Sequence, residues 1–209
     1  MTATRVPSAA LLLVALLALP AQAQPGPTQS ELSAAASTAA DWLHANHDYG
    51  GQRFVDLTGI DRQNVGTLRQ AGELRPFHTN PIVYRGTMYL TTSRSTIALD
   101  AVTCRVRWRH DWRPKARENW AQNRGVAVKA GKVIRGTSDG YLLALDAETG
   151  RLLWERAAAN AAIGETFTMP PVVYEDLVII GPAGSEVPIQ GWIGAFKLEN
   201  EGDPTPAAR

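Results

Sequence analysis

Residues 98–108 read ALDAVTCRVRW, and residues 144–154 read ALDAETGRLLW. The two stretches share Ala, Leu, Asp, Ala, Thr, Arg and Trp at an offset of 46 residues. Two short apolar runs, separated by a glycine-containing turn, precede each stretch, so each repeat predicts four short strands. Repeats of about 40 to 50 residues built from four strands are typical of β-propeller blades. A third unit begins at residues 172–180 and continues to residues 194–202 without the closing Trp.

The repeated stretch contains its own turn. Its Asp can accept hydrogen bonds from nearby backbone amides, and Gly150 readily adopts the positive φ of a tight turn. Trp154 follows four residues later on the next strand, where its ring can pack between neighbouring sheets. Cys104 occupies the glycine position in the first copy, and a non-glycine residue with positive φ is strained. We therefore expect the turn at Cys104 to be less regular than the turn at Gly150.

The repeats predict the fold class and the division of the chain. We expect an all-β protein that forms a partial β-propeller, with about three four-stranded blades, over residues 40–199. Residues 24–39 are rich in Pro, Ser and Ala with few large apolar side chains, and are interpreted as a flexible lead. The polar, proline-containing residues 200–209 are predicted to form a disordered tail.

Residues 1–23 have the pattern of a secretory signal peptide. Arg5 gives a positive start, residues 9–19 are an unbroken apolar run, and residues 21–23 read Ala-Gln-Ala, a small-x-small cleavage motif. An uncleaved anchor is the alternative, but eleven apolar residues are too few to span a bilayer. We expect cleavage after Ala23 and a periplasmic mature chain without a membrane span.

Charge and cysteine content exclude some functions. The full chain has a formal net charge of +1, and removal of residues 1–23 takes away Arg5 and no acid, which leaves a net charge of 0. A neutral chain argues against nucleic acid as a partner. Cys104 is the single cysteine, so no internal disulfide is expected. His44 and His47 could be considered as metal ligands, but without a third close ligand we favour a solvated loop.

Several segments together resemble the amino-terminal part of the quinoprotein alcohol dehydrogenases. They are the entry segment DWLHANHDYGGQRFVDLTGIDRQNV at residues 41–65, the repeats that end in Trp, NRGVAV at residues 123–128, and GPAGSEVPIQGW at residues 181–192. The likeness covers residues 40–197. It implies an eight-bladed propeller in the periplasm that holds pyrroloquinoline quinone (PQQ) and calcium on its axis. It also implies oxidation of alcohols or sugars, with transfer of electrons to an acceptor.

The resemblance implies a partial cofactor site. Arg124 matches an arginine that contacts the carboxylate and carbonyl edge of the quinone, and a planar guanidinium suits such oxygens. Thr168 matches a threonine whose hydroxyl donates to the cofactor.

The loop near residue 184 is the second part of that implied site. Ala183, Gly184 and Ser185 match small residues whose backbone approaches the quinone. Glu186 matches a carboxylate ligand of calcium, a cation that prefers oxygen donors. Without the resemblance, an exposed glutamate in a loop would carry no such meaning.

The chain also departs from the family pattern. Glu118 and Asn119 stand where its alcohol dehydrogenases commonly have two adjacent cysteines against one face of the quinone, and His78 stands in place of a glutamate. No residue matches the catalytic aspartate, the calcium-binding asparagine or the second arginine, so the expected chain lacks the general base. Two hypotheses follow. One is an amino-terminal fragment of a PQQ-dependent dehydrogenase, inactive alone. The other is a non-catalytic binding or assembly module built from propeller repeats.

Overall fold

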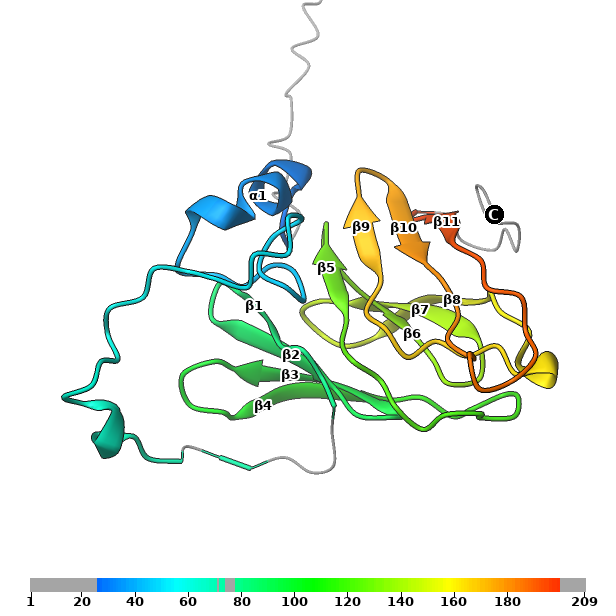
Figure 1. Cartoon of the computed structure of the whole chain (residues 1–209), viewed down its shortest axis with the longest axis horizontal. Helices are drawn as coiled ribbons and strands as arrows, with labels where there is room; N and C mark the ends of the chain where they lie inside the picture. The colour runs from blue at the N-terminus through cyan, green and yellow to red at the C-terminus, as the bar shows by residue number, and fades with distance from the viewer. Residues whose placement is uncertain (1–25, 71, 74–77, 200–209) are drawn as a thin grey trace, which may run out of the picture.

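The computed structural model describes residues 26–70, 72–73 and 78–199, so the predicted signal peptide and tail lie outside the described residues. Three antiparallel sheets follow one another along the chain (Figure 1). The first contains β1 (Ile82–Tyr84), β2 (Thr87–Thr91), β3 (Ser95–Asp100) and β4 (Val106–Asp111). The second contains β5 (Ala127–Lys129), β6 (Lys132–Gly136), β7 (Tyr141–Asp146) and β8 (Leu152–Ala157). The third contains β9 (Val172–Tyr174), β10 (Leu177–Ile180) and β11 (Gly194–Lys197).

Each sheet is a simple meander in which strands adjacent in sequence pair antiparallel. The third strands of the first two sheets, β3 and β7, are buried along nearly their whole length. A strand buried on both faces is typical of sheets that are packed face to face, as propeller blades are. The all-β partial propeller predicted from the repeats is thus confirmed. The third sheet has three strands among the described residues, in agreement with the absence of a third closing Trp.

The turns after β3 and β7 are nearly identical. The carboxylates of Asp100 and Asp146 each accept the backbone N–H three residues ahead at 2.8 Å. Cys104 N donates to Asp100 O at 2.9 Å, and Gly150 N donates to Asp146 O at 2.8 Å. Cys104 has φ 58° and Gly150 has φ 72°. The expectation of a less regular turn at Cys104 was therefore wrong, because the aspartate bonds hold both turns in the same conformation.

Two tryptophans join neighbouring sheets in the same way. Trp108, on β4, donates its indole N–H to Ala147 O of the second sheet at 3.0 Å. Trp154, on β8, donates to Leu198 O, directly after β11, at 3.2 Å. A Cβ added at Gly150 would lie 2.5 Å from Trp108, so the glycine is required by this contact as well as by its positive φ. The predicted packing of these tryptophans between sheets is confirmed.

The flexible lead expected at residues 24–39 is wrong for the described part of that segment. Thr28 and Glu31 form a capping box that starts α1 (Gln29–Ser33), and η1 (Ala35–Ser37) follows. Leu32 is 1% exposed and packs in the core beside side chains of the second and third sheets. Local capping and one buried leucine order a segment whose composition alone suggested flexibility.

Gln29 fixes the place of α1 against two sheets. Its side-chain oxygen accepts from Lys129 Nζ at 2.5 Å and from Glu175 N at 2.5 Å. Lys129 ends β5, and Glu175 lies in the turn between β9 and β10. Figure 1 shows α1 at the same end of the molecule as that turn. The N-terminal segment, residues 26–39, therefore bridges the second and third sheets.

The two histidines of the entry segment do not lie in a solvated loop, so that interpretation is corrected. His47 is 1% exposed, and its ring nitrogens face Asp48 Oδ2 and Thr38 O, both at 3.4 Å. His44 donates to Leu32 O at 2.9 Å, and burial lowers the pKa of its imidazole. Within the described ranges no three His, Cys, Asp or Glu side chains gather as a metal site. Both histidines instead hold the N-terminal segment in place.

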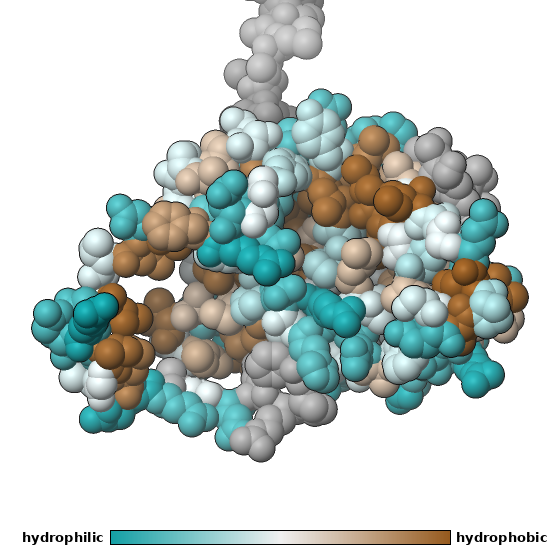
Figure 2. Space-filling model, in the orientation of Figure 1, coloured by the Kyte–Doolittle hydropathy of each residue, from teal (hydrophilic) through white to brown (hydrophobic). Residues whose placement is uncertain are grey.

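The first strand, β1, begins at residue 82, and Trp42 forms an isolated antiparallel bridge with Val83 of that strand. Before that point, residues 53–69 form an arm that runs away from the sheets and contains η2 (Val65–Thr67) (Figure 1). Figure 2 shows hydrophobic side chains along this arm. They are between 51% and 71% exposed: Phe54, Leu57, Ile60, Val65 and Leu68. No helix in the described part of the chain is long and apolar enough to cross a membrane.

Candidate functional site

A surface pocket of about 750 Å³ contains every site residue named from the sequence. These residues are Arg124, Thr168, Ala183, Gly184, Ser185 and Glu186. They come from three separate parts of the chain: the segment before β5, the segment before β9, and the loop between β10 and β11. We call it the Arg124 pocket. Its remaining lining residues are Trp120, Gln122, Pro182, Ile189 and Gly191.

Arg124 is held by backbone bonds on both sides. Arg124 N donates to Thr168 O at 2.8 Å, and Asn80 N donates to Arg124 O at 2.8 Å. Gly125 follows with φ 135°, and a Cβ there would lie 2.9 Å from Asn80 O. Only glycine therefore fits the close approach of these two backbone segments. The Asn-Arg-Gly turn directs an exposed arginine into the pocket from a fixed backbone.

The side chains of Arg124 and Thr168 are bonded to each other. Arg124 Nη1 donates to Thr168 Oγ1 at 2.8 Å, and Thr168 is 5% exposed. Since the hydroxyl oxygen accepts this bond, its hydrogen can be donated to a ligand. A guanidinium carries five N–H donors in one plane, so a single bond to Thr168 leaves donors for a carboxylate or a carbonyl. The pair thus presents hydrogen-bond donors to oxygen atoms of a ligand.

The loop between β10 and β11 is fixed at its start. Ala183 N donates to Thr166 O at 2.8 Å, and Thr166 N donates to Ala183 O at 3.3 Å. Gly184 then adopts φ 149°, and a Cβ there would lie 2.4 Å from Ile189 Cδ1. A larger residue at position 184 would be strained at this φ and would have to displace the Ile189 side chain. The backbone of this loop therefore lines the pocket in one defined conformation.

Glu186 provides an exposed carboxylate at the same pocket. Calcium takes six to eight oxygen ligands. Among the described residues, no group of three or more His, Cys, Asp or Glu could hold a metal ion. The side chains that line the Arg124 pocket therefore fit calcium only in part, because Glu186 is a single carboxylate and does not complete a site.

Trp120 and Gln122 are pocket residues that the sequence reasoning missed. Both lie in the connection between β4 and β5, four and two residues before Arg124, respectively. Neighbouring Asn123 is 2% exposed and donates to Gly136 O at 2.8 Å, which is the opposite environment. Their closeness in sequence to Arg124 is the signal that could have identified them.

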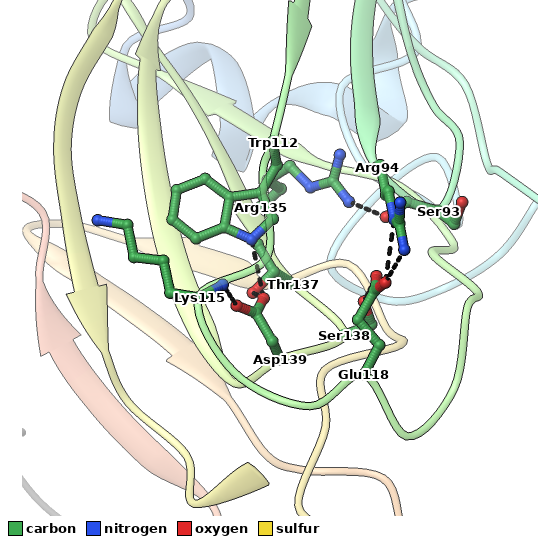
Figure 3. A network of polar contacts seen from close by, with 9 residues as sticks. All are labelled: Ser93, Arg94, Trp112, Lys115, Glu118, Arg135, Thr137, Ser138 and Asp139. Carbon is green, nitrogen blue, oxygen red and sulfur yellow. Dashed lines mark hydrogen bonds and ion pairs between the residues drawn. The ribbon is translucent and has the colours of Figure 1, made fainter.

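Glu118 and Asn119, the residues at the family's cysteine positions, make structural bonds. Glu118 accepts from Arg94 Nε at 2.9 Å and from Ser138 Oγ at 2.6 Å, as Figure 3 shows. Burial opposes ionisation of Glu118, but the bonds from Arg94 and Ser138 outweigh it and hold the pKa of this carboxyl below its ordinary value. Asn119 donates to Ala161 O at 3.0 Å. These bonds fix the connection that carries Trp120.

The polar network drawn in Figure 3 has a second part, which is centred on Asp139 and Arg135. Asp139 accepts from Trp112 Nε1 and from Lys115 N, both at 2.8 Å (Figure 3). Arg135 is completely buried and donates to Ser93 O at 2.8 Å, and burial lowers the pKa of its guanidinium to about 10. Trp112 and Lys115 follow β4, whereas Asp139 and Arg135 belong to the second sheet. The connection before Arg124 is therefore tied to the second sheet at several points.

The chain matches a protein-family model described as glucose/ethanol/alcohol dehydrogenase, beta-propeller domain, over residues 42–197. The chain belongs to the PQQ-dependent alcohol dehydrogenase propeller family. This membership confirms the resemblance seen in the sequence and agrees with the three sheets described above.

Individual members of the PQQ dehydrogenase family are similar over most of this chain. It is 35% identical to the quinohemoprotein alcohol dehydrogenase ADH IIB of Pseudomonas putida, over 90% of this chain and 29% of that protein. It is 32% identical to the lanthanide-dependent methanol dehydrogenase of Methylacidiphilum fumariolicum (strain SolV), over 75% of this chain and 28% of that protein.

Solved structures of the family agree with the fold. The quinohemoprotein alcohol dehydrogenase ADHIIG from Pseudomonas putida HK5 superimposes with a TM-score of 0.73 and 35% identity, over 81% of this chain and 27% of that chain. A europium-containing methanol dehydrogenase gives a TM-score of 0.70 and 31% identity, over 81% of this chain and 32% of that chain. The chain spans less than a third of the length of these relatives.

Proposed function

We propose that this chain supplies one wall of a PQQ site in a periplasmic dehydrogenase that oxidises alcohols or sugars. The observation that carries the proposal is the convergence of six residues, named from the sequence, on one pocket of about 750 Å³. They come from three separate segments, so chance proximity along the chain does not explain their meeting.

In this proposal, PQQ when bound supplies the redox chemistry, as the electron acceptor for the substrate. Arg124 and Thr168 bind its oxygens through the donors described above, because a guanidinium and a hydroxyl both donate to carboxylate and carbonyl groups. The backbone of residues 183–185 lies against the ligand. Glu186 contributes one oxygen ligand to calcium, and further oxygen ligands are needed to complete the site.

The direct test is a calorimetric titration of the purified chain with PQQ in the presence of calcium. We expect saturable binding that Arg124→Ala weakens about tenfold or more, since a hydrogen bond to a charged group contributes about 1.5 to 3 kcal/mol. Arg113→Ala is the matched control, because Arg113 is an exposed arginine of the same connection that does not line the pocket. It should leave binding unchanged.

Two results would contradict the proposal. Equal affinities for Arg124→Ala and Arg113→Ala would show that the quinone does not use the Arg124 pocket. Absence of saturable binding up to millimolar PQQ would favour the non-catalytic binding or assembly module. The bonds of Glu118 and Asn119, which stabilise the fold at the cysteine positions, are the observation that keeps this second function in view.

A further inference from the structure

We propose that Trp120 is the stacking platform of the Arg124 pocket, against which the planar ring of the ligand lies. This inference rests on the proposed function. It adds a ligand-binding residue at a position for which the family resemblance implies no role. The ligand class that it specifies is a flat aromatic molecule that carries carboxylates. Three observations support it: the exposure of the indole, the rigidity of its segment, and the charge beside it.

The exposure of Trp120 sets it apart from the other tryptophans. It is 39% exposed, the largest fraction among the six, all of which lie in described residues. Trp108, Trp112 and Trp154 are between 6% and 8% exposed, and each donates its N–H to a protein acceptor. Trp120 instead is a lining residue of the Arg124 pocket. An exposed indole at a pocket is a surface on which an aromatic ligand can bury area.

The segment that carries Trp120 is held on both sides of the residue. Before it, Glu118 accepts from Arg94 and Ser138, and Asn119 donates to Ala161 O at 3.0 Å. After it, Asn123 donates to Gly136 O at 2.8 Å. Because these anchors come from the two neighbouring sheets and from η3 (Ala161–Ile163), the backbone at residue 120 has little freedom. Binding therefore orders few additional groups, which reduces its entropic cost.

The charge at the pocket complements the ring. Arg124 lies four residues further along the same segment, and both residues line one pocket. A flat aromatic carboxylate can place its ring on the indole while its carboxylate accepts from the guanidinium. Stacking on an aromatic side chain contributes about 1 to 3 kcal/mol per ring in nucleic-acid complexes. Trp120 and Arg124 together thus select for both the shape and the charge of such a ligand.

The test compares PQQ titrations of the wild-type chain, Trp120→Ala and Trp120→Phe. We expect Trp120→Ala to weaken binding about five- to hundredfold and Trp120→Phe to retain most of the affinity, because phenylalanine preserves a flat ring. Phe54→Ala is the control, since Phe54 is 71% exposed in the arm and does not line the pocket. Circular dichroism of each variant shows whether the sheets remain folded.

Two further measurements separate stacking from charge. Citrate is a non-aromatic tricarboxylate, so its binding should respond to Arg124→Ala and not to Trp120→Ala. Addition of PQQ should decrease the tryptophan fluorescence less in folded Trp120→Phe than in the wild type. The variant lacks the indole that would lie against the ligand.

The outcomes separate this inference from the proposed function. Equal affinity of folded Trp120→Ala and wild type for PQQ, with Arg124→Ala still weakened, would overturn the stacking role and leave the proposed function standing. A wild-type chain that binds no PQQ would overturn both. Equal losses for PQQ and citrate in Trp120→Ala would also refute stacking, because they would indicate a general disturbance of the pocket.

Discussion

Glu118 accepts hydrogen bonds from residues of two sheets, Arg94 in the turn between β2 and β3 and Ser138 in the turn between β6 and β7. A buried or half-buried carboxylate with two such donors stabilises the fold through its ionised form. The family commonly has a cysteine against one face of the quinone at this position. In this chain Glu118 instead joins the first two sheets.

The pH dependence of stability should report this role. The pKa of Glu118 is lowered in the folded chain, so its contribution is fully present above the ordinary value of 4.5 and is lost as the pH falls through the folded pKa. We expect Glu118→Gln to lower the free energy of unfolding by about 1 to 3 kcal/mol at pH 7. The difference from wild type should shrink as the pH falls below 4.5.

Urea unfolding between pH 3 and pH 7 measures that difference. Glu148→Gln serves as the control, because Glu148 is exposed in the turn after β7. A constant difference between Glu118→Gln and wild type across the range would contradict an ionised Glu118 as the source of the stability.

At this scale the sequence predicted some pocket residues and missed others for a physical reason. Arg124 and Glu186 belong to short motifs, which remain recognisable without knowledge of the backbone. Trp120 belongs to no motif, and its place at the pocket follows from the path of the chain before Arg124. His47 was misjudged because its burial depends on the N-terminal segment, which was expected to be flexible. The sequence did not predict the surroundings of side chains that depend on contacts with residues distant in the chain.

Among the elements, the contact between β4 and the second sheet depends on a glycine. Gly150 has φ 72°, and a Cβ there would lie 2.5 Å from the ring of Trp108. We expect Gly150→Ala to lower the free energy of unfolding by about 2 to 4 kcal/mol, since it adds left-handed strain to overpacking. Thermal unfolding followed by circular dichroism measures the change.

Cys104→Gly tests the equivalent position of the first sheet. Cys104 already adopts φ 58° without glycine, so this change should alter stability by less than about 1 kcal/mol. If Cys104→Gly stabilised the chain by as much as Gly150→Ala destabilises it, turn strain, rather than the Trp108 contact, would be what makes Gly150 necessary.

The strands could be predicted because their limits are set locally by turn chemistry. The aspartate-capped turns after β3 and β7 and the glycine-containing hairpins appear directly in the sequence. α1 could not be predicted in this way, because five residues are too few to show a helical period. Its stability comes from the capping box and from burial of Leu32 against sheets that are distant in sequence.

Considered as a whole molecule, the chain spans less than a third of the length of the relatives named above. Within the described residues, the Arg124 pocket has one carboxylate, Glu186, and no other His, Cys, Asp or Glu in its lining. We expect no alcohol-dependent dye reduction by the 209-residue chain with added PQQ and calcium. Calcium binding and general-base catalysis both need groups that this lining does not supply.

If the enzyme is split between two chains, addition of a separately expressed chain that carries the remaining propeller blades should produce activity. Glu186→Ala should then abolish it, whereas Glu148→Ala, which alters an exposed carboxylate outside the pocket, should not. Robust activity of the 209-residue chain alone would falsify the incomplete-site proposal. Activity of the combined chains that is insensitive to Glu186→Ala would remove the calcium assignment.

The bonds of Gln29 also constrain the order of events during folding. Its partners Lys129 and Glu175 follow it by 100 and 146 residues. Contacts between residues so far apart form late, because closing a long loop costs entropy before the contact stabilises anything. The first two sheets contain mostly local pairings and can form earlier. The helix nearest the start of the described chain is therefore expected to be among the last elements to dock, after the β9–β10 hairpin has formed.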